Sequence, residues 1–139
     1  MTSAAVRALF ARHNTVLRRL CRWAFAISAI AVCILSLIPD DSLRPYAPQD
    51  KVSHLIAYSE LAALGLLAFR PRPSPAIVLL GVVALGGALE IAQAYVPGRS
   101  ADLLDFVFNC VGVCIGFVLA RAVARIWPIP GRRTAYDAS

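Results

Sequence analysis

Three groups of polar and ionisable residues stand where apolar stretches of the sequence begin or end. Lysine and arginine can bind phosphate, imidazole and carboxylate groups can transfer protons, and phenol and amide groups can orient a ligand. In chain order, the first group is Asp50, Lys51, His54 and Tyr58, the second is Glu90 and Gln93, and the third is Arg99, Asp102, Asp105 and Asn109. If the apolar stretches cross a membrane in alternating directions, all three groups meet at one face of the bilayer. Ionisable groups near hydrocarbon are costly, so their convergence predicts a functional site.

Proton transfer would fall to His54, Glu90 and Asp105, because imidazole and carboxylate groups are the usual general acids and bases. Hydrolysis or transfer at a phosphoester is the natural reaction class for this set, but the sequence leaves open whether the protein is an enzyme. The residues predicted to bind the ligand are Asp50, Lys51, Tyr58, Gln93, Arg99 and Asn109. Among them, Lys51 and Arg99 would hold an anionic group.

Each candidate also has a purely structural interpretation. His54 would hydrogen-bond Glu90 or Asp105 and hold two helices together. Glu90 would form a salt bridge with Arg99 or Lys51, and Arg99 would otherwise pair with an aspartate of the third group. Tyr58 would serve as a structural hydrogen-bond donor. Structure and function remain open alternatives for these side chains.

A metal site drawn from Asp50, His54, Glu90 and Asp105 is a weaker prediction. One histidine among carboxylates disfavours a structural zinc, and a loosely held divalent ion with oxygen ligands would fit better. Asp50 is better placed to cap the first turn of a helix than to act in catalysis. We therefore predict neither a resident metal nor a cofactor.

The composition indicates a membrane protein. The chain of 139 residues is 59% hydrophobic and 16% charged, with a mean hydropathy of +0.68. Four stretches are apolar nearly all round: Trp23–Ile38, Val52–Phe69, Ala76–Val96 and Leu103–Ala120. As helices they reach roughly 24 to 32 Å, which is enough to cross a bilayer core of about 30 Å. The predicted fold class is an all-α bundle of four transmembrane helices.

Arginine placement predicts the orientation. The N-terminal segment, the second loop and the C-terminal tail hold 11 of the 14 basic residues, so the positive-inside rule places both termini in the cytoplasm. The predicted organisation is a basic amphipathic segment over residues 1–22, a membrane domain over 23–127 and a cytoplasmic tail over 128–139. Within the first segment, Ala4–Arg22 predicts an amphipathic helix on the inner leaflet. The dispersed basic residues do not indicate nucleic-acid binding.

Helical rotation tests whether the polar residues share a face. At about 100° per residue, Asp102, Asp105, Asn109, Gly112 and Gly116 fall within one arc of roughly 80°. The two glycines allow a neighbouring helix to approach closely. The third stretch shows a similar polar stripe towards its end. With that stretch helical to its end, its glutamate would lie on the order of 10 Å below the outer end of the helix.

Several motifs occur together in a characteristic order. They are Ile34–Pro39 (ILSLIP), Asp50-Lys51-x-x-His54-x-x-x-Tyr58, Glu90-x-x-Gln93, Pro97-Gly98-Arg99, and Asp105-x-x-x-Asn109-x-x-Gly112-x-x-x-Gly116. This set, over roughly Cys33–Leu119, resembles the VanZ-like family of bacterial membrane proteins. The family name comes from a protein associated with resistance to teicoplanin. The resemblance implies a role in the cell envelope, without a defined reaction.

The sequence as a whole predicts a VanZ-like multi-pass protein of the bacterial plasma membrane. Its extracytoplasmic polar residues would bind or process an anionic lipid or a lipid-linked glycan headgroup. Two alternatives remain open: a small proton-coupled transporter, motivated by Glu60 and Glu90, and a structural subunit of an envelope complex. The partners to expect are that headgroup, and a second copy of the chain or an envelope protein.

Overall fold

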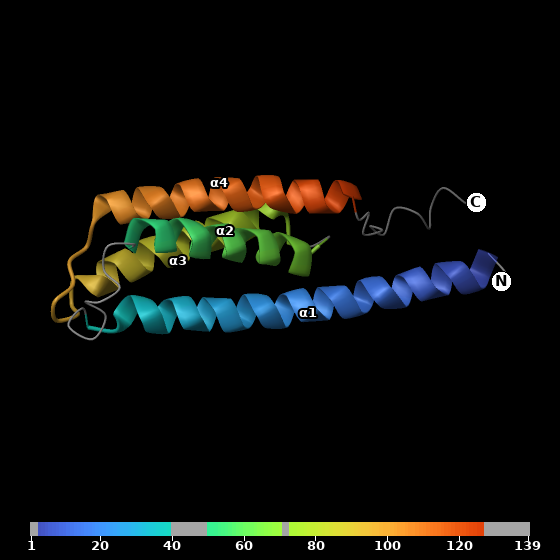
Figure 1. The fold of residues 1–139 in the computed structure, drawn as a ribbon, viewed down its shortest axis with the longest axis horizontal. Helices are drawn as coiled ribbons and strands as arrows, with labels where there is room; N and C mark the ends of the chain where they lie inside the picture. The colour runs from blue at the N-terminus through green and yellow to red at the C-terminus, as the bar shows by residue number, and fades with distance from the viewer. Residues whose placement is uncertain (1–2, 40–49, 71–72, 127–139) are drawn as a thin grey trace.

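The computed structural model describes residues 3–39, 50–70 and 73–126; for residues 3–13 and for Asp50 it describes the backbone alone. Within these ranges the chain forms four α-helices and no strand (Figure 1). The helices are α1 (Ser3–Leu37), α2 (Asp50–Ala68), α3 (Pro75–Gln93) and α4 (Leu103–Ile126). The predicted all-α fold class is confirmed. The predicted tail over residues 128–139 lies outside the described residues.

Helix α1 runs without interruption through 35 residues. The segment Ala4–Arg22, expected as a separate helix, is therefore continuous with the apolar stretch that follows it. Nothing between Ser3 and Leu37 breaks the helix, because this range contains neither proline nor glycine. That the amphipathic part lies on the inner leaflet stays a prediction.

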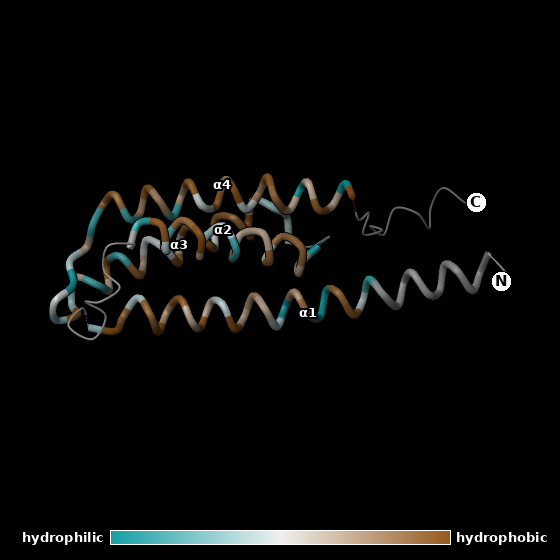
Figure 2. Tube along the Cα trace, viewed as in Figure 1, coloured by the Kyte–Doolittle hydropathy of each residue, from teal (hydrophilic) through white to brown (hydrophobic). Residues whose placement is uncertain are grey.

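Three segments of the described helices are long and apolar enough to cross a membrane: Asn14–Leu37, Pro75–Gln93 and Leu103–Ile126. The described parts of these helices are mostly hydrophobic, as the brown colour in Figure 2 shows. Large apolar side chains on them, such as Trp23, Leu80 and Val118, are mostly exposed. A surface of this kind suits lipid, because water would make its exposure costly. Four crossings, with both termini cytoplasmic, stay a prediction, because α2 is not one of the three segments.

Helix α2 is the centre of the bundle and contacts α1, α3 and α4. This position explains its mixed composition, since a helix surrounded by protein can carry polar side chains that its neighbours satisfy. The core around it consists of buried side chains from three helices: Tyr58, Leu61, Ala62, Val82 and Val113. The rings of Phe25 and Phe69 pack edge to face, with their centroids 5.5 Å apart, and join α1 to the end of α2.

Helices α2 and α4 run parallel and nearly touch through their backbones. A β-carbon placed on Gly112 would lie 2.6 Å from the carbonyl oxygen of Leu55, and one placed on Gly116 would overlap the carbonyl oxygen of Ser59. Only glycine permits this approach, as the predicted small-residue stripe implied. The polar face of α4 is therefore pressed against α2.

Alternating helix directions bring the end of α1, the start of α2, the end of α3 and the start of α4 to one end of the bundle (Figure 1). The polar residues gather at this end, as expected. Helix α3, however, ends at Gln93, whereas the sequence predicted a helix up to Val96. A turn stabilised by the bond from the amide of Val96 to the carbonyl of Gln93 follows it. Glu90 thus lies in the last turn of α3, about 5 Å from its end.

Candidate functional site

Lys51, in the first turn of α2, joins α2 to the start of α4. Its Nζ donates to Asp102 Oδ2 at 2.9 Å and to Asp105 Oδ1 at 3.0 Å. Asp102 in turn accepts a bond from the amide of Leu104 at 2.8 Å and so caps α4. One lysine therefore neutralises part of the charge of two carboxylates and fixes the relative positions of two helix starts.

This ion pair gives a testable pH dependence. The hydrogen bond from Lys51 lowers the pKa of Asp102, and bonds to Asp102 and Asp105 raise the pKa of Lys51. A lowered carboxyl pKa stabilises the folded state above about pH 4, and a raised lysine pKa does so below about pH 10. We expect the melting temperature in detergent to fall as the pH drops below about 4, and this fall to be smaller in Lys51→Met. An equal fall in both proteins would contradict the assignment.

His54 lies one turn deeper on α2 and contacts α4. Its Nδ1 lies 2.9 Å from Asn109 Oδ1, and both side chains are buried. Because a carbonyl oxygen only accepts, this contact places a proton on Nδ1. The ring of Tyr58 is stacked nearly parallel to the imidazole, with centroids 6.4 Å apart. His54 is thus fixed in orientation by one hydrogen bond and one aromatic neighbour.

Glu90 brings α3 into the same group. Its Oε2 accepts a bond of 3.3 Å from the amide of Asp102, and its Oε1 lies 3.8 Å from His54 Nδ1. The first contact ties the end of α3 to the start of α4, and the second is an ion-pair distance rather than a hydrogen bond. The salt bridges of Glu90 to Arg99 or Lys51, considered from the sequence, are absent among the contacts that the structure describes.

Arg99 and Gln93 face α1. Arg99 donates from Nε to the carbonyl of Ile38 at 2.9 Å and from Nη2 to that of Leu35 at 3.3 Å, and Gln93 donates to the carbonyl of Ser36 at 3.1 Å. Gly98 permits this geometry, because its φ of 77° is strained for other residues. These two side chains stabilise the unpaired carbonyls at the end of α1.

The structure thus divides the predicted site residues. We use the name polar cluster for the residues that meet between α2, α3 and α4: Lys51, His54, Tyr58, Glu90, Asp102, Asp105 and Asn109. Gln93 and Arg99 belong to the α1 contact, and the side chain of Asp50 lies outside the described part of the structure. Asp102 is among the polar residues that the sequence singled out, but it received no predicted catalytic or ligand-binding role, although a helix-capping aspartate three positions before Asp105 is a recognisable signal.

Three buried polar atoms of the polar cluster have no hydrogen-bond partner among the described residues: Tyr58 Oη, Glu90 Oε1 and Asn109 Nδ2. Tyr58 and Asn109 are each 1% exposed, and Glu90 is 6% exposed. Buried polar groups are normally paired, so each unpaired atom requires an explanation. Together these atoms supply two hydrogen-bond donors and one acceptor within the polar cluster. A bound ligand would provide the missing partners.

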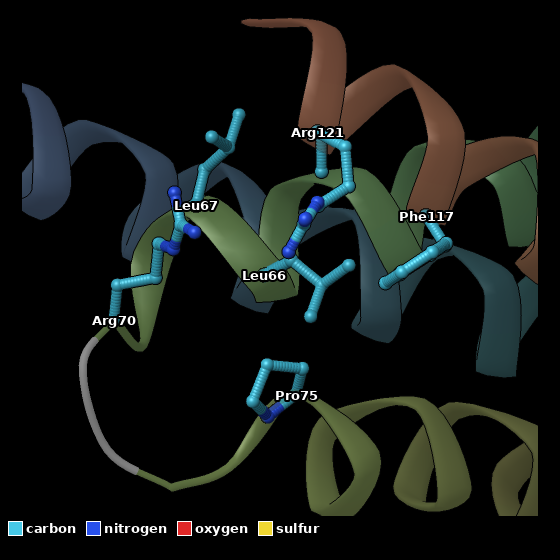
Figure 3. A pocket seen from close by; sticks show the side chains of 7 residues that line it. Leu66, Leu67, Arg70, Pro75, Phe117 and Arg121 are labelled. Atoms are coloured by element: carbon cyan, nitrogen blue, oxygen red, sulfur yellow. The ribbon is translucent and has the colours of Figure 1, made fainter. Parts of the chain in front are cut away.

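The opposite end of the bundle has a different character. Arg70 and Arg121 flank a pocket between α2, α3 and α4 whose other walls are apolar, including Leu66 and Phe117 (Figure 3). Its volume of about 20 Å³ suits roughly one water molecule. A larger pocket of about 220 Å³ adjoins it beside Arg70. Neither pocket is lined by a carboxylate or an imidazole. Among the sites described so far, the candidate acid–base residues therefore lie in the polar cluster.

Comparison with known proteins gives one match. The VanZ/LLP1 family model matches residues 4–125, most of the chain. This range includes every residue of the polar cluster, the end of α1 and nearly all of α4. No curated protein and no solved structure matches the chain.

Proposed function

The chain belongs to the VanZ/LLP1 family, and from this premise we propose that it acts in the bacterial cell envelope by binding an anionic lipid or lipid-linked glycan headgroup at the polar cluster. Its membrane-type helices support a position in the plasma membrane, with the polar cluster on the extracytoplasmic side. A contribution to resistance against teicoplanin-type glycopeptides belongs to the same proposal, as the family resemblance implies.

The unpaired donors of the polar cluster are the observation that carries this proposal. Tyr58 Oη and Asn109 Nδ2 are both buried, and both side chains lie close to Gly86, where a β-carbon would contact the Tyr58 ring at 3.0 Å and Asn109 Nδ2 at 3.2 Å. Phosphate and glycan oxygens are acceptors of the kind that both donors lack. Binding such a group would remove the cost of two buried, unsatisfied polar atoms.

Positive charge at the edge of the polar cluster also supports an anionic ligand. The Lys51 side chain is 41% exposed, so its ammonium group remains accessible beside the two aspartates that it bridges. Arg99 was expected to share this role, but its donors point to α1. We therefore assign the first contact with the anionic group to Lys51, and to Arg99 the task of holding the end of α1 next to α3 and α4.

The proposal is tested by native mass spectrometry of the purified full-length protein with phosphatidylglycerol, a polyprenyl phosphate and phosphatidylcholine. We expect the wild-type protein to retain an anionic lipid in preference to phosphatidylcholine. The two anionic probes distinguish a phospholipid from a lipid-linked carrier. Tyr58→Phe should weaken this binding by about 3- to 10-fold, the effect of one lost hydrogen bond of about 1 kcal/mol.

Tyr95→Phe is the matched control, because it removes a hydroxyl group that is exposed at the end of the bundle, on a residue 84% exposed. It should bind the anionic lipid as the wild-type protein does. Equal lipid retention by wild type, Tyr58→Phe and Lys51→Met would contradict headgroup binding at this site. That result would favour the structural role in an envelope complex, with the polar side chains serving only to hold helices together.

Proton-coupled transport is less well supported by the described residues. Glu60 accepts a hydrogen bond of 2.8 Å from Ser28 on α1 and is exposed on the outer side of α2, away from the polar cluster. Glu90, the other carboxylate that motivates transport, lies at one end of the bundle. Alternating access requires one site near the bilayer midplane, whereas Glu60, in the middle of α2, and Glu90, at the end of α3, lie at different depths and do not form a single site.

A further inference from the structure

We propose that His54, Glu90 and Asp105 bind a divalent transition-metal cation. The three residues come from α2, α3 and α4, all are buried, and one ligand atom from each lies within 4.8 Å of the others. Ligand atoms held about 2.1 Å from a common ion are about 3.0 to 4.2 Å apart, so the side chains would have to approach one another by up to about 1.8 Å to complete the geometry. The sequence offered these residues, with Asp50, as a weaker candidate for a metal site and predicted no resident metal.

An unpaired carboxylate oxygen is the independent observation in favour of a cation. Glu90 is 6% exposed, and its Oε1 has no hydrogen-bond partner among the described residues although it faces the imidazole of His54 at 3.8 Å. A buried carboxylate oxygen without a partner is costly, and a metal ion removes this cost directly. Oε2 is already engaged by the amide of Asp102, which fixes the direction in which Oε1 points.

The charge of the polar cluster also favours a cation. Glu90, Asp102 and Asp105 carry three negative charges, against one positive charge on Lys51. Arg99 donates to carbonyl groups of α1 and leaves this excess in place. A divalent ion would neutralise this excess. The ion would also provide an electrophilic centre for a phosphate oxygen of the proposed headgroup. Binding of the metal does not depend on binding of the headgroup.

The ligand chemistry narrows the choice of ion. Imidazole suits zinc, iron and nickel, whereas carboxylates suit magnesium, calcium and manganese, so a mixed set favours a first-row ion such as Mn²⁺ or Zn²⁺ over Ca²⁺. Asn109 contacts Nδ1 of His54 at 2.9 Å, the type of outer contact that orients metal-binding imidazoles. Three protein ligands leave coordination positions for water or substrate.

The test is metal binding by the full-length protein in detergent, without added lipid, after treatment with EDTA. Mn²⁺ and Zn²⁺ are titrated separately, bound metal is measured after gel filtration, and the Mn²⁺ site is examined by electron spin-echo envelope modulation. We expect about one ion per chain, a higher melting temperature with the ion, and a nitrogen coupling from the imidazole in the Mn²⁺ spectrum. Ca²⁺ should bind more weakly.

Glu90→Gln keeps the shape of the side chain and removes its charge, so it should bind Mn²⁺ at least tenfold more weakly than the wild-type protein. Asp105→Asn provides a second variant with the same expected loss. Glu60→Gln is the matched control, because it makes the same change on the exposed side of α2 and should bind as the wild-type protein does. Absence of stoichiometric binding, equal affinity in folded Glu90→Gln, or a spectrum without nitrogen coupling would overturn the site. Tyr58→Phe should retain the metal, which separates this result from the test of headgroup binding.

Discussion

Gly116→Ala will unfold at a markedly lower denaturant concentration than the wild-type protein. Its new β-carbon would overlap the carbonyl oxygen of Ser59 and lie 2.7 Å from the β-carbon of Ala62. Two backbones would have to separate to accommodate it, because neither obstacle is the flexible end of a side chain. Overpacking of this kind costs roughly 1 to 3 kcal/mol. An SDS titration followed by circular dichroism measures the change.

Gly81→Ala is the matched control for this substitution. Gly81 also lies inside a helix, but a β-carbon there meets nothing within 4 Å. Alanine should therefore leave stability unchanged or increase it by up to about 1 kcal/mol, since it has the higher helix propensity. If the two variants unfold together, the close contact between α2 and α4 is not what stabilises the bundle.

The second large effect is expected from the buried bond between His54 and Asn109. Either His54→Phe or Asn109→Leu removes one partner of a contact of 2.9 Å between two buried polar side chains. Each single variant should lose about 1 to 3 kcal/mol of unfolding free energy. The double variant should lose less than the sum, because it removes both polar groups together. SDS unfolding of the four proteins gives the coupling energy as a double-mutant cycle.

Ser28→Ala combined with Asn109→Leu is a suitable reference cycle. Ser28 lies on α1 and donates a hydrogen bond to Glu60, whereas Asn109 contacts His54, so the two contacts are separate. Their effects should add to within about 0.5 kcal/mol. Additive losses for His54→Phe and Asn109→Leu as well would show that the two buried side chains contribute independently, and would remove the basis for treating them as one unit.

The sequence predicted which faces of the helices meet. Periodicity placed Asp105, Asn109, Gly112 and Gly116 on one stripe of α4, and all four are buried. Such a prediction succeeds because the rotation per residue depends only on local backbone geometry. The convergence of polar residues at one end follows from the same rule, once the helices alternate in direction. These two features fix most of the polar cluster.

Side-chain partners were harder to predict than faces. Arg99 was expected to bind an anion or an aspartate, but it reaches the carbonyls of Leu35 and Ile38. That choice depends on where the end of α1 lies in space, which no local pattern encodes. The partners of Lys51, two aspartates at the start of α4, could not be predicted for the same reason. The extent of α3 was overestimated because the apolar run continues to Val96 after the helix has ended at Gln93.

The backbone contact at Gly112 and Gly116 has a mechanical consequence. Two parallel helices joined so closely move as one rigid body, and this body carries Lys51, His54 and Asp105. Helix α3 contacts that body less extensively and contributes Glu90. Any opening of the polar cluster would therefore be a hinge displacement of α3, which separates Glu90 from His54 and leaves the lysine bridge between α2 and α4 intact.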